Sequence, residues 1–262
     1  MMKPANDAHS IQAVALVLEF PAEVQPEGLT FLAEASKRFR NKLNMRSVIR
    51  QAEFSLSIGE MQPLRPNAVA GYRYFTKKQD GTDKQWFEVS GNRAIFCATD
   101  YTDFNSFRAE AFYFLDLACQ AFRYSEVEPN KITLEYRDEF RSNEFDWEPY
   151  QLLNSSSIYL THGAIKKSNM WHSHFGFFDK TDGCKILNTG RIDHVHGIDG
   201  FDDSQFSQVN IVLTHALEIP KKESRGNWAD HLEGLREVHL DHLRDILSSE
   251  AALAIGLRKE KC

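Results

Sequence analysis

The sequence of 262 residues holds ten histidines, and these side chains have the clearest capacity for chemistry. Nine lie between residues 162 and 242, and four of the nine form two His-x-His pairs. These pairs are His172 with His174, and His194 with His196. Residues i and i+2 of a strand point to the same face, so each pair could present two imidazoles together. If the two strands are neighbours, four ring nitrogens could converge with Asp193 or Asp199 on Zn²⁺, Fe²⁺ or Mn²⁺. One hypothesis is therefore a metal-dependent hydrolase that uses the His-x-His pairs.

The same spacing also fits histidines on a solvated strand face, and we prefer this interpretation. The pairs lack the continuation of a His-x-His-x-Asp-His string, and no carboxylate has a fixed place from which it could orient the rings. His239 lies between Leu235 and Leu243 in an apolar stripe, which favours a hydrogen-bonded core or interface histidine. We therefore predict no catalytic residue, no bound metal and no cofactor, and we expect purified protein to hold no stoichiometric Zn²⁺ or Mn²⁺.

Motifs of several common enzyme classes are absent from the sequence. There is no phosphate-binding GxxxxGK[ST] loop, no GxGxxG after a strand, no GxSxG elbow and no HExxH helix. Serine, carboxylate and histidine residues occur without a spacing that selects a catalytic triad. The pattern favours a protein that is not an enzyme, although it leaves the question open.

The balance of charges argues against one broad class of partner. The chain has 31 Lys and Arg against 37 Asp and Glu, and its net charge of −6 gives no electrostatic case for nucleic acid. A local basic cluster at Arg38, Arg40 and Lys42 falls in the last turns of an expected helix. Cations complement the helix dipole at that end, so the cluster needs no ligand to explain it.

Cysteine spacing and the first residues indicate the compartment. The four cysteines form no CxxC pair, which favours a reducing environment over a disulfide framework. They are Cys97, Cys119, Cys184 and Cys262. Residues 1–10 are polar and lack the design of a signal peptide, and the apolar run over 11–20 is too short to span a membrane. The sequence therefore predicts a cytoplasmic protein without a transmembrane segment.

Among the elements that would position the histidines, the stretch from residue 85 to residue 140 has the clearest pattern. A hairpin over 85–97 precedes a helix over 103–124, and a strand over 132–140 follows. Asp103 is the expected N-cap, because its carboxylate can accept the unpaired amides of the first turn. Apolar residues of the helix recur at intervals of three and four, which predicts one buried face. They are Phe104, Phe107, Ala111, Leu115, Ala118 and Phe122.

The remaining segments suggest two similar halves. The N-terminal half, residues 1–145, is predicted as strand, helix (29–43), strands, helix and strand. The C-terminal half, residues 146–262, is predicted as four strands followed by a helix over 228–248. The four strands are placed at 158–165, 170–178, 185–197 and 208–219. Sequential hairpins favour antiparallel pairing. We therefore predict an α+β fold of two halves, each a mainly antiparallel sheet covered by a long amphipathic helix.

The order of these elements, together with three short motifs, resembles a sporadically distributed, uncharacterised family of prokaryotic proteins of about this length. The motifs are Leu134-Glu135-Tyr136-Arg137-Asp138, Val238-His239 and Ile246-Leu247-Ser248-Ser249-Glu250. The first keeps the tyrosine of the family pattern Leu-Arg-Tyr-Ile-Asn and loses the arginine before it and the asparagine after it. The resemblance implies no established activity and no catalytic residues.

The patchy distribution implied by the resemblance is typical of genes in mobile or defence loci. We therefore expect a non-enzymatic binding, sensor or assembly component of a multi-gene prokaryotic system, with anti-phage defence as one setting. The expected partner is a protein encoded nearby, and a homodimer is an alternative assembly. Besides the metal-dependent hydrolase, the second alternative function is a sensor of a small molecule or lipid with an aromatic pocket.

Overall fold

The computed structural model divides the chain into two compact units, which are described separately. Unit 1 comprises Met1–Val14, Thr133–Glu218 and Trp228–Cys262, and unit 2 comprises Ala15–Ile132 and Ile219–Asn227. The structure describes residues 2–4, 9–50, 53–57, 60–64, 69–143, 147, 149–166, 170–181, 184–198, 204–219 and 228–257. The division expected after residue 145 lies outside the described residues and stays a prediction, and Cys262 also lies outside them.

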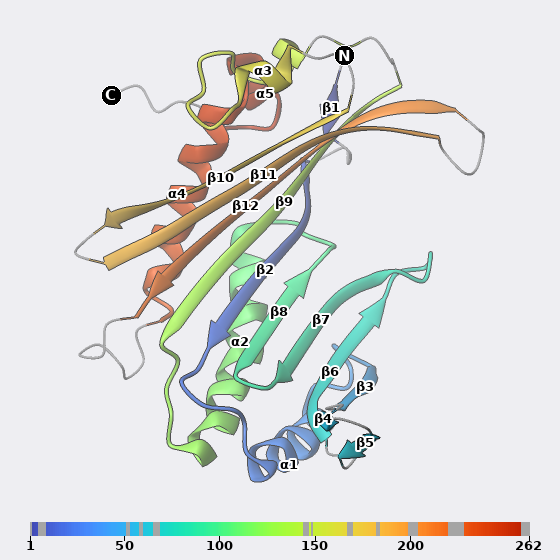
Figure 1. Cartoon of the computed structure of the whole chain (residues 1–262), viewed down its shortest axis with the longest axis vertical. Helices are drawn as coiled ribbons and strands as arrows, with labels where there is room; N and C mark the ends of the chain where they lie inside the picture. Colours follow the sequence, from blue (N-terminus) through green and yellow to red (C-terminus); the bar gives the residue numbers. More distant parts are fainter. Residues whose placement is uncertain are drawn as a thin grey trace. The chain divides into compact units, whose positions relative to one another are not determined.

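Unit 2 is built on an antiparallel meander with two helices. Strands β6 (Val69–Lys77), β7 (Asp83–Ser90) and β8 (Arg93–Ala98) lie side by side, and β3 (Met45–Arg50) pairs with β6 (Figure 1). Helix α2 (Phe104–Phe122) packs on β8, and α1 (Pro26–Ala35) packs on α2. Short 3-10 turns follow the helices at Ser36–Arg38 and Arg123–Ser125, and strands β4 (Glu53–Ser57) and β5 (Glu60–Leu64) form a separate hairpin.

The aromatic helix predicted from residue spacing is confirmed as α2. The Asp103 carboxylate caps it by accepting a hydrogen bond from the Ser106 amide at 2.9 Å. Phe114 is fully buried at the centre of the helix, and its ring lies 5.3 Å, centroid to centroid, from three other rings. Those rings belong to Phe39, Phe87 and Phe96. The apolar stripe therefore forms the core of unit 2.

Helix α1 lies unusually close to α2 at one point and ends earlier than the sequence predicted. A Cβ atom at Gly28 would lie 2.4 Å from the Ala121 carbonyl oxygen, so this crossing requires glycine. The helix expected to continue to residue 43 ends at Ala35, and a 3-10 turn of three residues follows. The beginning of α1 is therefore held close to α2, and the chain after the helix turns toward β3.

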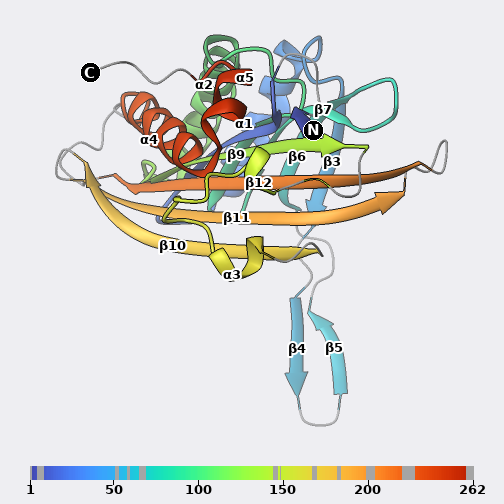
Figure 2. The same ribbon diagram turned by 90° about the horizontal axis from the view of Figure 1, so that it is seen from above.

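Unit 1 combines three long strands with helix α4. Strands β10 (Trp171–Thr181), β11 (Cys184–Ile198) and β12 (Gln205–Glu218) form successive antiparallel hairpins, and α4 (His231–Ile246) packs on β12 (Figure 2). Shorter elements are β1 (Lys3–Pro4), a 3-10 turn at Pro149–Gln151, α3 (His162–Ile165) and α5 (Ser249–Ala254). The strand expected over 158–165 is wrong, because this segment forms turns and the single turn of α3.

The predicted fold of two separate sheets, each covered by a long helix, is also wrong. The chain forms one antiparallel sheet of ten strands in the order β10-β11-β12-β9-β2-β8-β7-β6-β3, with β1 paired to β9. Strands β2 (Ile11–Glu19) and β9 (Lys131–Ser142) each have residues in both units. Hydrophobic patterns predict local hairpins, whereas the pairing of β2 with β9 joins residues far apart in the sequence. Unpaired edge groups favour such joining, because backbone amides and carbonyls require partners.

Among the described residues, no helix is long and apolar enough to cross a membrane.

Candidate anion-binding site

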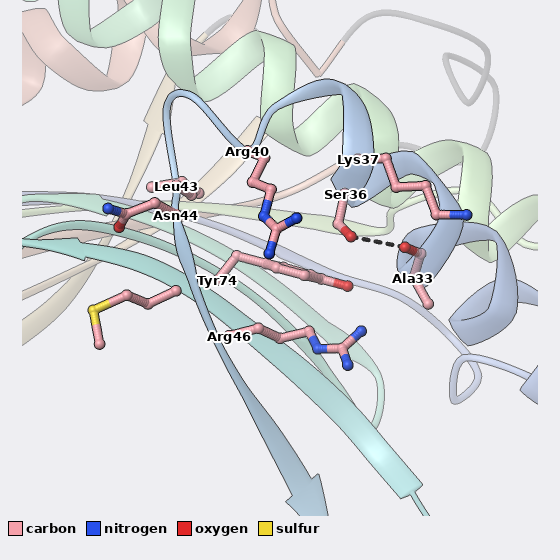
Figure 3. A pocket seen from close by; sticks show the side chains of 9 residues that line it. Ala33, Ser36, Lys37, Arg40, Leu43, Asn44, Arg46 and Tyr74 are labelled. Atoms are coloured by element: carbon pink, nitrogen blue, oxygen red, sulfur yellow. Dashed lines mark hydrogen bonds between the residues drawn. The ribbon is translucent and has the colours of Figure 1, made fainter.

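A cavity of about 320 Å³ opens in unit 2 between the end of α1, the following loop and strands β3 and β6. Figure 3 shows the side chains around it. The lining residues are Ala33, Ser36, Lys37, Arg40, Leu43, Asn44, Met45, Arg46 and Tyr74. Three of these nine carry a positive charge and none carries a negative charge, so the cavity has the lining of an anion site.

One buried phenylalanine fixes the loop that carries the basic residues. Phe39 is 1% exposed, and its ring meets the rings of Tyr74 and Phe114 edge-on at centroid distances of 5.2 and 5.3 Å. The Phe39 carbonyl accepts backbone hydrogen bonds from the amides of Lys42 and Leu43 at 2.9 and 3.0 Å. The chain is thus tightly turned around Phe39, and this turn places Arg40 at the cavity.

Tyr74 lines the cavity together with the two arginines. Its side chain is 2% exposed, and its hydroxyl donates a hydrogen bond to the Leu32 carbonyl at 3.2 Å. Burial raises the pKa of Tyr74 to about 12, and the nearby Arg46 charge opposes this rise. Figure 3 shows Arg40 above the Tyr74 ring and Arg46 below it. The tyrosine therefore stays neutral and adds no negative charge to the site.

The two arginines are available to a ligand. In the described part of the chain, neither Arg40 nor Arg46 has a carboxylate partner, whereas Lys37 forms an exposed ion pair with Glu34 at 2.6 Å. The Arg46 guanidinium also lies 5.3 Å from the centre of the Tyr72 ring. A guanidinium offers a planar fork of N–H donors that matches the oxygens of a carboxylate or phosphate. Two such forks near one cavity can hold an oxyanion from two directions.

The hydroxyl groups of the cavity are engaged in structural hydrogen bonds. Ser36 donates to the Ala33 carbonyl at 2.7 Å, and Tyr74 donates to Leu32 as described above. The described residues that line the cavity include no histidine or carboxylate that could act as a general base. The arrangement is suited to holding an anion and lacks an activated nucleophile.

The structure does not bring the four predicted metal-binding histidines together. In the register of β10 with β11, Trp171 pairs with His194 and His172 pairs with Asp193. Directly paired residues share a face and neighbours along a strand alternate, so the two His-x-His pairs lie on opposite faces of the sheet. His174, paired with Arg191, is on the face of His172, and His196 is on the face of His194.

Each of the two pairs has its own surroundings. His172 and His174 are exposed. The buried His194 accepts a hydrogen bond at Nε2 from the Trp147 indole at 3.0 Å, and His196 shares one with Ser207 at 3.0 Å.

The two aspartates predicted as further ligands of the same metal site do not complete it. Asp193 forms an ion pair with Arg191 at 2.8 Å, and Asp199 lies outside the described residues. In the ranges that the structure describes, no group of three His, Cys, Asp or Glu side chains is placed to hold a metal ion.

Sequence reasoning missed the basic cavity because it attributed Arg38, Arg40 and Lys42 to a helix terminus. Helix α1 has no basic residue in its last turn, so the dipole explanation does not apply. The available signal was the density of positive charge over residues 37–46 in a chain of net charge −6. The contribution of Tyr74, which comes from a later strand, had no local signal.

No protein-family model matches the chain, and no curated protein sequence matches it.

Proposed function

We propose that unit 2 is a non-enzymatic binding module that holds a small anion in the cavity between Arg40 and Arg46. The observation that carries this proposal is a cavity lined by three cations and no carboxylate. A phosphate or carboxylate group would accept hydrogen bonds from both guanidinium forks. The lining contains one aromatic residue, Tyr74, so the cavity favours an anion over the lipid expected for an aromatic pocket.

Titration calorimetry with inorganic phosphate tests the proposal on the full chain. The native protein should bind phosphate, and affinity should fall as ionic strength rises because the attraction is electrostatic. Arg40→Gln and Arg46→Gln should each weaken binding by about tenfold or more, since a hydrogen bond to a charged group contributes roughly 1.5–3 kcal/mol.

Arg38→Gln is the matched control, because Arg38 belongs to the same basic cluster and does not line the cavity. It should change the affinity by about twofold or less, as expected for one exposed charge. All three variants should keep the melting temperature of the native protein. Undetectable phosphate binding, or an equal loss in Arg38→Gln and Arg46→Gln, would show that the cavity is not the site.

We further propose that anion binding is the input of a sensor or assembly component in a multi-gene prokaryotic system. The support is the family resemblance together with a binding cavity that lacks a catalytic base. The product of an adjacent gene should be retained by the immobilised protein, and Arg46→Gln should change that retention when phosphate is present. Retention that is the same with and without phosphate would separate partner binding from the cavity.

A further inference from the structure

Three histidines form a buried cluster in the core of unit 1, away from the two His-x-His pairs. His215 belongs to β12, and His239 and His242 belong to α4. Their exposed fractions are 0%, 1% and 6%. The His215 ring centre lies 5.7 Å from that of His239 and 5.2 Å from that of His242. The cluster therefore lies in the contact between α4 and the sheet of its own unit.

Hydrogen bonding defines the protonation of His215. Its Nδ1 lies 2.8 Å from the Asn188 side-chain oxygen, which can only accept, so Nδ1 carries the proton. Asn188 in turn donates to an Asp179 carboxylate oxygen at 3.5 Å. In the neutral ring the other nitrogen, Nε2, then holds a lone pair. This atom is buried, and within the described part of the chain it has no hydrogen-bond partner.

The two histidines of α4 also have buried ring nitrogens without hydrogen-bond partners among the described residues. These atoms are Nδ1 of His239 and Nδ1 of His242. The expectation that His239 is a hydrogen-bonded core residue is therefore confirmed for its burial and wrong for this nitrogen. Three buried polar atoms without partners are costly in a core, and a proton added there would place a charge where burial disfavours it.

Rings and fixed charges surround the cluster from each packed element. Tyr136 of β9 stacks on His239 at 4.0 Å, and the rings of Tyr159 and Phe177 lie 5.0 and 5.5 Å from His242. Burial lowers the pKa of all three histidines, that of His215 to about 3, that of His239 well below its usual value of 6.5, and that of His242 below the same value.

Charged groups around the cluster act in both directions. The positive charge of Arg236 adds to the lowering at His239, whereas Asp179, Asp241 and Asp245 oppose it at His242. Asp241 pairs with Arg244 at 2.7 Å, and Asp245 accepts a hydrogen bond from Ser157 at 2.6 Å. Both carboxylates are thus already engaged, and burial prevails at each of the three rings.

We propose that the cluster of His215, His239 and His242 is an acid-sensitive latch that releases α4 from the sheet of unit 1. In the closed state the three rings are neutral. When α4 separates, water reaches the rings and each can take up a proton at its ordinary pKa of 6.5. Below that pH, each histidine that titrates favours the open state by about tenfold for each further pH unit.

A buried carboxyl in the same unit acts in the opposite direction and must be separated from the latch. Burial raises the pKa of Asp138 to about 6, while a hydrogen bond from Ser10 at 2.6 Å opposes the rise. A raised carboxyl pKa stabilises the folded state at low pH, and this contribution is lost as pH rises toward 6. Asp138 therefore cannot cause the release of α4 in acid. Its protonation stabilises the folded state at low pH, and the histidines must outweigh that stabilisation.

Amide hydrogen exchange, measured at about pH 7.5 and about pH 5.5 and corrected for intrinsic rates, tests the latch on the native full chain. Protection of α4 should fall by about tenfold or more at the lower pH, because at least one histidine then favours the open state. Protection of α2 should change by less than about threefold, since residues 15–132 contain no histidine. Unchanged protection of α4, or an equal fall in α2, would overturn the proposal.

The double variant His239→Phe/His242→Phe removes two of the three titrating rings and keeps aromatic side chains in contact with Tyr136, Tyr159 and Phe177. It should reduce the pH-dependent fall of α4 protection by about tenfold for each of the two rings that titrates. The matched control His172→Gln/His174→Gln alters two exposed histidines of the same unit and should leave that fall unchanged. An unreduced fall in the Phe variant, or a similar reduction in the Gln variant, would contradict the latch.

Discussion

The two units solve the problem of burying a core in different ways. Six of the largest fully buried side chains are phenylalanines of unit 2: Phe20, Phe39, Phe87, Phe96, Phe114 and Phe122. By contrast, all eleven buried polar or charged side chains among the described residues belong to unit 1. They include Asp138, Asn188 and four histidines. Unit 2 keeps its charges at the surface, where they line a cavity, whereas unit 1 buries ionisable groups.

This difference has consequences for how each unit responds to its surroundings. The buried Tyr74 of unit 2 has a pKa of about 12 and stays neutral at acid and neutral pH, so the aromatic core of unit 2 should make its stability depend little on pH in that range. Buried ionisable groups tie stability to pH, because the folded state favours their neutral forms. The cavity of unit 2 should therefore respond to anions, and the core of unit 1 should respond to protons.

The largest expected effect is the loss of an aromatic ring from the core of unit 2. Phe122 is fully buried, and its ring stacks on Phe20 with centroids 3.6 Å apart. Phe122→Ala should lower the free energy of unfolding by about 3–5 kcal/mol, the usual range for truncating a buried phenylalanine. Phe178→Ala is the control, because Phe178 is 59% exposed and should cost about 0.5 kcal/mol or less. Denaturant unfolding measures both, and a loss near that of the control would mean that the ring is not part of the core.

The next effect concerns the buried carboxyl of unit 1. The Asp138 pKa of about 6, against an ordinary 3.8, means that stability falls by up to about 3 kcal/mol as pH rises from 4 to 6. Asp138→Asn should abolish that fall, because the amide cannot ionise and can still accept the Ser10 hydrogen bond. The variant should therefore be more acid-sensitive than the native protein, since the histidines are then unopposed. Unfolding curves across this pH range test the sign, and an unchanged profile would mean that Asp138 is ionised in the fold.

A smaller effect compares the helix caps of the two units. Asp103 accepts the Ser106 amide hydrogen bond at 2.9 Å, and Ser248 accepts that of Ala251 at 3.2 Å. Asp103→Ala and Ser248→Ala should each lower the melting temperature by roughly 3–6 °C, as expected for one lost N-cap. Hydrogen exchange should assign the first loss to α2 and the second to α5. Asp103→Asn, which retains a cap oxygen, should recover most of the loss.

The smallest effect sharpens the interpretation of the cavity. Glu34 and Lys37 form an exposed ion pair that contributes little to stability. Glu34→Gln should leave the melting temperature unchanged and raise phosphate affinity by roughly two- to threefold at low salt, because Lys37 is then free to face the anion. Glu27→Gln, at the opposite end of α1, is the control and should leave affinity unchanged. A weaker affinity in Glu34→Gln would contradict an electrostatic role for Lys37.

Local features of the fold could be predicted from the sequence because they depend on residues close together in the chain. The apolar spacing over residues 103–124 has a helical period, and Asp103 stands where an N-cap is needed, so α2 followed directly. The alternation of apolar and polar residues likewise indicated β-hairpins. Period alone could not show that α1 ends at Ala35, because Phe39 continues the apolar pattern while it serves as the anchor of a turn.

Only the tertiary structure decided how these elements combine. Side chains of a strand alternate between the two faces of the sheet. Because the register pairs His194 with Trp171 and not with His172, the two histidines lie on opposite faces. The joining of all major strands into one sheet depends on β2 and β9, which lie more than a hundred residues apart. The cavity depends on Tyr74 reaching the loop that follows α1, and the histidine latch depends on α4 folding back on β12. Helices, hairpins and charge density follow from residues that are close in the sequence, whereas contacts between distant side chains arise from packing, for which the chain carries no local signal.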